Sequence, residues 1–288
     1  MSSFPLFCQK LEPKKRTFDP DTTVFSKIMD RNYQLYMSFP RAYSTKDSIE
    51  YPVLYVLDGK YRFPIFTSAR ESMDFDNLLE DVIIVGVSSG LDFVSWGRNR
   101  NYDLTPSQDT IHDRKLEKDA SVAYGLSYDS IRGTVQSGGA KKFLQCMTDE
   151  IIPFVEKHYK TTDDRGITGY SLGGLFTAWC LLNSDGVFKR YGINSPSFWW
   201  KNSDFLNQAE MWFNKNDTWD IPLTKVFISV GEQEPQVMIS GIEKFKNLLV
   251  RKAHKNISLI THQFEGETHN SVGGPNLKRT IYVLYEKN

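Results

Sequence analysis

One serine in this sequence stands in a setting that suits nucleophilic chemistry. Ser171 lies in the stretch G-Y-S-L-G, residues 169–173, between a short β-capable run and an apolar run with helical spacing. The glycines at 169 and 173 have no Cβ, so they leave room for a sharp turn from strand into helix. Such a nucleophile elbow presents a serine hydroxyl at the amino end of a helix, where negative charge is stabilised. We therefore expect Ser171 to be a nucleophile; the alternative is a glycine-rich turn whose serine only caps the helix.

A serine hydroxyl needs a base that takes its proton, and histidine is the usual base. With an elbow serine the chain order is serine, acid, histidine, because the acid and the histidine follow later strands. Of the five histidines, three follow Ser171. His254 lies in a charged helical stretch and His262 lies inside an expected strand, so we interpret both as structural. His269 comes directly after the last expected strand, in a glycine-containing loop, and is the expected base.

The carboxylate that orients the histidine should follow a strand between Ser171 and His269. The stretch "KVFISVGEQEP" provides such a strand, followed by Glu232 and Glu234. We favour Glu234, which stands three residues beyond the glycine that ends the strand. Glu232 remains the alternative, as does a Ser–His pair that works without a carboxylate.

The oxyanion of the tetrahedral intermediate that a serine nucleophile forms with a carbonyl group needs two backbone N–H donors. One donor should be the amide of Leu172, directly after the nucleophile. The second should come from the loop after an early strand, and "YVLDGKYRF" ends such a strand at Asp58-Gly59-Lys60. We therefore assign the second donor to the Lys60 amide; the alternative is an ordinary turn at the end of a strand.

The elements that must position these residues alternate along the whole chain. Apolar β-capable runs alternate with stretches of helical spacing, which predicts one α/β domain over residues 1–288, with a mainly parallel sheet and helices on both faces. Between about residues 88 and 139 the pattern is irregular, and we expect a lid-like loop insertion there. The expected strands are 33–40, 51–59, 82–87, 165–169, 190–195, 225–231 and 256–266, and the expected helices are 138–159, 172–182, 241–253 and 277–285.

Composition limits the partners. Lys plus Arg and Asp plus Glu both total 35, so the formal net charge is zero and gives no reason to expect binding to nucleic acid or to an anionic membrane. Cys8, Cys146 and Cys180 are far apart and form no C-x-x-C pair, so we expect neither a disulfide framework nor a metal site. No apolar run is long enough to span a membrane, and the first residues carry no signal-peptide pattern, which predicts a soluble, cytoplasmic protein.

Seven stretches together resemble those of a known group: "YVLDGKYRF", "RNYDLTP", "FVEKHY", "GYSLGGLFTAW", "NSPSFWW", "ISVGEQEP" and "FEGETHNSV". The sequence is similar to the esterase D-like family of α/β-hydrolases, and within it to the enterochelin and bacillibactin siderophore esterases. The resemblance implies an oxyanion amide at Lys60 and a substrate-pocket arginine at Arg100; the alternative for Arg100 is a guanidinium that holds the long loop in place. Trp199 and Trp200 would line the pocket, although adjacent tryptophans point in different directions and one of them should be core.

These observations predict a serine carboxylic ester hydrolase that needs no cofactor and acts on a small-molecule ester, either of siderophore type or with a short acyl chain. Two alternatives stay open. A thioesterase or acyltransferase would use the same intermediate, and a hydrolase-like binding module would use none. The sequence does not give the oligomeric state.

Overall fold

The computed structural model describes residues 19–46, 48–216, 219, 221–251 and 256–287. Cys8, His254 and the N-terminal stretch that was read for targeting signals lie outside these residues. Within the described ranges, no helix combines the length and the apolar character needed to cross a membrane.

The core of the fold is an eight-stranded sheet with the strand order β1-β2-β4-β3-β5-β6-β7-β8. β1 and β2 pair antiparallel, and β2 also pairs antiparallel with β4, whereas all pairs from β4 to β8 are parallel. The expected mainly parallel sheet is therefore confirmed, with β1 as an added edge strand. The strands are β1 (Thr22–Ser26), β2 (Arg31–Ser38), β3 (Tyr51–Leu57), β4 (Ile83–Ser89), β5 (Thr161–Tyr170), β6 (Arg190–Asn194), β7 (Thr224–Gly231) and β8 (Ile257–Phe264).

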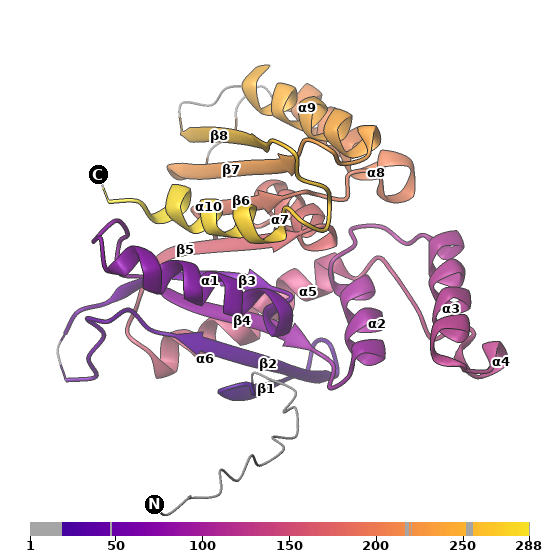
Figure 1. Ribbon diagram of the computed structural model, residues 1–288, viewed down its shortest axis with the longest axis horizontal. Coiled ribbons are helices and arrows are strands. Elements are labelled where there is room, and N and C mark those ends of the chain that lie inside the picture. The colour runs from indigo at the N-terminus through magenta and orange to yellow at the C-terminus, as the bar shows by residue number, and fades with distance from the viewer. Residues whose placement is uncertain (1–18, 47, 217–218, 220, 252–255, 288) are drawn as a thin grey trace, which may run out of the picture.

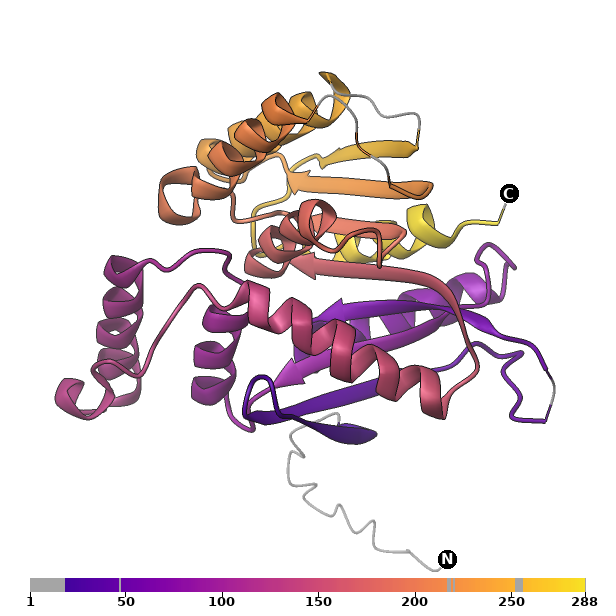
Figure 2. The same cartoon turned by 180° about the vertical axis from the view of Figure 1, so that it is seen from behind.

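Helices cover both faces of the sheet (Figures 1 and 2). Along β3, Val53, Tyr55 and Leu57 belong to one buried cluster and Leu54 and Val56 to another, as the two-residue period of a strand requires. The first cluster packs under the α5-to-α9 helices and the second under α1 and α10. The helices are α1 (Gly59–Asp74), α5 (Ala140–Cys146), α6 (Ile152–His158), α7 (Leu172–Asn183), α8 (Trp200–Lys215), α9 (Gln236–Arg251) and α10 (Gly273–Tyr285), with a π-helical turn, η1 (Met147–Ile151), between α5 and α6.

The segment between β4 and α5 is more regular than its sequence suggests. It contains α2 (Phe93–Asp103), α3 (Thr110–Tyr124) and the short α4 (Tyr128–Ile131) in place of the expected irregular loop. Side chains at the helix starts stabilise α2 and α3: Asp92 and Ser95 form a capping box, and Asp109 accepts from two first-turn amides of α3. These helices lie beyond the carboxyl ends of the parallel strands (Figure 1), which is the edge where α/β proteins place their sites.

Candidate active site

Ser171 stands at the turn between β5 and α7. Its backbone has φ 60° and ψ −116°, a strained conformation outside the regions that serine normally adopts. The glycines that permit the turn are not both the expected ones. A Cβ on Gly169 would lie 2.2 Å from the Gly173 carbonyl oxygen, and one on Gly174 would lie 2.6 Å from the Asn194 carbonyl oxygen, whereas a Cβ on Gly173 would make ordinary contacts at 3.7 Å. Close packing therefore requires glycine at 169 and 174, and the expectation for residue 173 is wrong.

Ser171, His269 and Glu234 form one hydrogen-bonded line. The Ser171 hydroxyl lies 3.2 Å from His269 Nε2, and His269 Nδ1 lies 2.8 Å from Glu234 Oε2. The residues come from three different connections: the β5–α7 turn, the loop between β8 and α10, and the turn after β7. The order of the three residues along the chain predicted that their side chains lie close together, because the carboxyl ends of parallel strands lie at one edge of the sheet.

Glu234 is held as an ionised carboxylate. Its side chain is fully buried, and its Oε1 accepts from the Ser195 hydroxyl at 2.6 Å and from the Gly231 amide at 2.9 Å. Burial raises the pKa of the Glu234 carboxyl, but the hydrogen bonds from His269, Ser195 and Gly231 outweigh burial and leave its pKa below the ordinary value. Glu232 instead accepts from the Gly266 amide at 2.8 Å in an exposed turn. Of the two candidate acids, the structure brings only Glu234 to His269.

The ring of His269 is supported from the elbow. Tyr170, the residue before the nucleophile, stacks on His269 with ring centroids 5.0 Å apart and planes inclined by 28°. The guanidinium of Arg62, from α1, lies 4.3 Å from the centroid of the same tyrosine ring. The imidazole is therefore fixed by Glu234 at its Nδ1 edge and by Tyr170 at its face.

Both proposed oxyanion donors lie in the first turn of a helix. Leu172 begins α7, and Lys60 is the second residue of α1. Backbone N–H groups at these positions have no acceptor within their helix, and the helix dipole favours negative charge there. Asp58, in the left-handed conformation at φ 55°, turns β3 into α1, and its Oδ2 would lie 3.7 Å from a Cβ on Gly173. The two helix starts therefore lie side by side. The Lys60 side chain donates to the Leu91 carbonyl at 2.9 Å.

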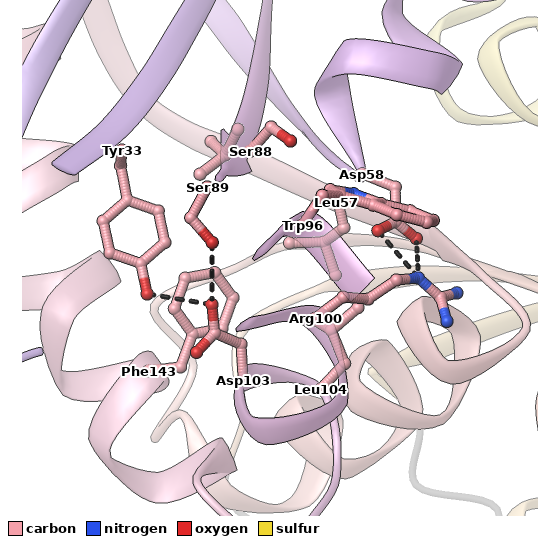
Figure 3. Close-up of a pocket in the computed structure, with 11 residues that line it drawn as sticks. Tyr33, Leu57, Asp58, Ser88, Ser89, Trp96, Arg100, Asp103, Leu104 and Phe143 are labelled. Atoms are coloured by element: carbon pink, nitrogen blue, oxygen red, sulfur yellow. Dashed lines mark hydrogen bonds and ion pairs between the residues drawn. The ribbon is translucent and has the colours of Figure 1, made fainter. Parts of the chain in front are cut away.

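Arg100 has its partners inside the protein. From α2 its Nε donates to both carboxylate oxygens of Asp58, at 2.8 and 2.9 Å, and one terminal nitrogen donates to the Tyr170 carbonyl at 3.2 Å. Figure 3 shows the pair beside Trp96 at a small cavity of about 20 Å³. These contacts hold α2, and with it the segment between β4 and α5, against the elbow and the start of α1. They agree with the alternative interpretation of Arg100, a guanidinium that holds the long segment in place, rather than with a substrate-pocket role.

A second buried carboxylate lies on the other side of this cavity (Figure 3). Asp103 accepts from the Tyr33 hydroxyl at 2.9 Å and forms an ion pair with Arg31. Burial raises the pKa of the Asp103 carboxyl to about 7, against the opposing effect of Arg31. These contacts join the last residue of α2 to β2, and so they fix the helix that carries Arg100.

The two tryptophans differ in exposure. Trp200 is 1% exposed and its indole N–H donates to the Ser107 carbonyl at 3.0 Å, so it holds the connection between α2 and α3. Trp199 is half-buried and lies with its ring centroid 5.6 Å from that of His112 in α3. The core tryptophan of the pair is thus Trp200, and Trp199 is the one that keeps an exposed part.

The sequence analysis missed two serines of the stretch "NSPSFWW". Ser195 donates to Glu234, and the Ser197 hydroxyl lies 3.1 Å from the Ser171 hydroxyl. Their place in the sequence could have identified them, because both serines lie within three residues after β6, the strand that pairs with the elbow strand β5. Serine is so common in loops that its type alone gave no reason to single them out. Among the described residues, no group of three or more His, Cys, Asp or Glu side chains could hold a metal ion.

The fold and the site can be compared with known proteins. Residues 26–274 match the family model described as "Putative esterase". The ferri-bacillibactin esterase BesA of Bacillus subtilis is 25% identical over 86% of this chain and 82% of its own length. The siderophore triacetylfusarinine C esterase of Aspergillus fumigatus is 23% identical over 93% of this chain and 94% of its own. The crystal structure of the BES protein from Bacillus cereus has a TM-score of 0.75 and 28% identity, covering 95% of this chain and 99% of that one. Because the family model spans most of the sequence, the chain belongs to this esterase family, and it is a carboxylic ester hydrolase with an α/β fold.

Proposed function

We propose that the chain is a serine carboxylic ester hydrolase that works through an acyl-enzyme intermediate. Ser171 is the nucleophile, His269 the general base and Glu234 the acid that orients His269. The amides of Lys60 and Leu172 form the oxyanion hole. The observation that carries this proposal is the unbroken line of hydrogen bonds from Ser171 through His269 to the buried Glu234 carboxylate. No step requires a cofactor.

Acylation begins when the Ser171 Oγ–H proton moves to His269 Nε2 and an oxygen electron pair forms a bond to the ester carbonyl carbon. The carbonyl π electrons move to its oxygen, which the Lys60 and Leu172 amides stabilise. The resulting imidazolium faces the Glu234 carboxylate at 2.8 Å, which stabilises its charge. When the intermediate collapses, the bond to the alcohol oxygen breaks, and that oxygen takes the proton from Nε2.

Deacylation repeats the sequence with water as the nucleophile. His269 Nε2 takes a proton from water, the water oxygen bonds to the acyl carbon, and the same oxyanion donors act again. The bond between the acyl carbon and Ser171 Oγ then breaks, and Oγ recovers its proton from Nε2. The carboxylic acid leaves and the free enzyme is restored.

For the substrate, we propose a small-molecule ester of siderophore type, with short-chain acyl esters as simpler substrates. The support is the similarity to relatives that are named as a ferri-bacillibactin esterase and a siderophore triacetylfusarinine C esterase. Arg100 adds no support for recognition of an anionic substrate, because its charge is paired with Asp58. A half-buried Trp199 beside α3 is consistent with an aromatic wall of the pocket.

A hydrolysis screen tests this function. Purified protein is assayed against p-nitrophenyl esters of short acids, acyl thioesters and cyclic siderophore ester lactones, with the Ser171→Ala variant as the blank. We expect turnover of oxygen esters that the blank lacks. A preference for thioesters would favour the thioesterase alternative, and absence of turnover on every ester would favour a binding module.

A further inference from the structure

The segment that follows β6 contacts both ends of the Ser171–His269–Glu234 line. Its backbone is tied to the elbow, because the Ser171 amide donates to the Asn194 carbonyl at 3.0 Å and the Ser197 amide donates to the Ser171 carbonyl at 3.0 Å. A third bond, from the Ser195 amide to the Ser229 carbonyl at 2.8 Å, ties the same segment to β7. The position of the two serine side chains is therefore set by backbone contacts to both neighbouring strands.

The hydroxyls of Ser195 and Ser197 contact different residues of the Ser171–His269–Glu234 line. Ser195 lies in the left-handed backbone region at φ 42°, and its hydroxyl donates to Glu234 Oε1 at 2.6 Å. Two residues later, the Ser197 hydroxyl lies 3.1 Å from Ser171 Oγ. The exposed fractions are 0% for Ser195 and 1% for Ser197. Because both groups are buried, bulk water cannot readily replace either hydroxyl.

The direction of the hydrogen bond between the two hydroxyls follows from the rest of the network. Glu234 is ionised and can only accept, so His269 Nδ1 carries a proton and donates it. In the neutral imidazole, Nε2 then has a free electron pair and accepts the Ser171 hydroxyl proton. Ser171 Oγ has no second proton to give. The Ser197 hydroxyl must therefore be the donor, and Ser171 Oγ the acceptor.

We propose that Ser197 is a further catalytic residue, which acts in acylation by donating a hydrogen bond to the nucleophilic oxygen; this inference rests on the proposed function. The bond occupies one electron pair of Oγ and restricts rotation of the Ser171 hydroxyl. The proton of that hydroxyl then points at His269 Nε2, and the other electron pair is free for the ester carbonyl. Ser197 keeps its own proton throughout, so no atom is transferred to or from it.

The effect of Ser197 should be larger in acylation than in deacylation. In the acyl-enzyme, Ser171 Oγ is held by a covalent bond to the acyl carbon, so its orientation needs no further support. The nucleophile in deacylation is water rather than Ser171, and Ser197 then acts only when Oγ leaves the acyl carbon, because its hydrogen bond stabilises the departing oxygen. Ser195 differs, because it is a positioning residue that acts through Glu234, and Glu234 and His269 serve both halves.

Pre-steady-state hydrolysis of p-nitrophenyl acetate separates the two rate constants, since the burst reports acylation and the steady rate reports deacylation. We expect Ser197→Ala to lower the acylation rate constant about tenfold, the effect of one lost hydrogen bond of ordinary strength, and to lower the deacylation rate constant by about threefold or less. Ser197→Thr keeps the hydroxyl and should restore acylation to within about threefold of wild type. Ser195→Ala should slow both steps.

A matched control comes from a buried hydroxyl in another part of the fold. Ser184 is 4% exposed and lies 3.0 Å from the Tyr191 hydroxyl. Ser184→Ala should leave both rate constants at the wild-type values, and circular dichroism checks that each variant is folded.

Two results would overturn the role of Ser197. One is an unchanged acylation rate constant in Ser197→Ala, and the other is an equal fall of both constants, which is what a general loosening of the site would give. Failure of the proposed function itself is seen separately, because wild-type protein would then show no burst or Ser171→Ala would retain one.

Discussion

Arg100 and Asp58 form a buried ion pair that joins the insertion to the site. The side chains are 16% and 4% exposed, and the Arg100 Nε lies within 2.9 Å of both Asp58 oxygens. Asp58 directly precedes the Gly59 and Lys60 turn, and the same guanidinium donates to the carbonyl of Tyr170. One side chain of α2 therefore contacts both the turn that carries the Lys60 amide and the elbow that carries Ser171.

Removal of Arg100 should weaken both the fold and the reaction. Arg100→Ala leaves the Asp58 carboxylate buried without its partner, which costs about 3–5 kcal/mol of unfolding free energy. Because the oxyanion turn then loses its support, we expect kcat to fall by about tenfold or more, as for a weakened oxyanion donor. Urea denaturation gives the first value and steady-state kinetics the second.

The same variant distinguishes this positioning role from substrate binding. A positioning role predicts equal losses of kcat/KM on a neutral and on an anionic p-nitrophenyl ester, since the oxyanion turn serves both. If Arg100 instead bound substrate charge, KM would rise for the anionic ester alone. Arg100→Lys keeps the charge but lacks the planar set of N–H donors of the guanidinium. Its unfolding free energy should therefore lie between those of Arg100→Ala and wild type.

Ser171→Ala and His269→Ala should each reduce turnover at least about a thousandfold, because nucleophile and base act as a unit. His262 provides the matched control, since it lies on β8 with an exposed side chain. Hydrolysis of a p-nitrophenyl ester by His262→Ala should be near wild type. Wild-type activity in either site variant would disprove the assignment.

The two candidate acids can be compared with one substitution in each. Glu234→Gln keeps the size of the side chain but removes the charge that faces His269, so kcat should fall at least about a hundredfold with little change in KM. Glu232→Gln changes only the partner of the Gly266 amide in an exposed turn and should be close to wild type. If both variants were near wild type, the site would be a Ser–His pair without a required carboxylate.

Stability should depend on pH through Glu234. A carboxyl whose pKa is lower in the folded protein stabilises the fold above the unfolded-state pKa and loses that contribution as the pH falls through the folded-state pKa. The pKa of the Glu234 carboxyl is lowered in this sense by hydrogen bonds that outweigh its burial. The difference in unfolding free energy between wild type and Glu234→Gln should therefore be largest above about pH 5 and shrink toward pH 3. A urea-denaturation series over this range measures it, and a constant difference would contradict the prediction.

Two glycines of the elbow should respond differently to the same substitution. Gly169→Ala places a Cβ 2.2 Å from the Gly173 carbonyl oxygen, so the strand and the helix must separate, and we expect Tm to fall by about 10 °C or more. In Gly173→Ala the new Cβ meets its neighbours at 3.7 Å or more, and Tm should stay within about 3 °C of wild type. Thermal unfolding followed by circular dichroism tests the pair, and equal losses would show that the turn needs both glycines.

Local sequence determined most of the elements and the positions of the nucleophile and the base. The elbow could be predicted because a strand, a serine between glycines and an apolar helix are adjacent in the chain. His269 could be predicted because it follows the last strand. The helices α2 and α3 could not, because several of their large apolar residues face solvent: Ile111 is 83% exposed and Val122 is 85% exposed. Without a buried apolar face there is no helical period to detect.

Tertiary structure alone decided which of several similar residues contact one another. Glu232 and Glu234 have the same chemistry and lie two residues apart, and only the path of the turn after β7 directs one of them to His269. Arg100 donates to Asp58, which lies 42 positions away in the sequence, and the Ser197 hydroxyl contacts the Ser171 hydroxyl, which lies 26 positions away. The physical reason is that hydrogen bonds and ion pairs depend on distance and direction at the ångström scale. A one-dimensional pattern specifies the type of each donor and acceptor, and only the packed strands bring a particular pair within reach.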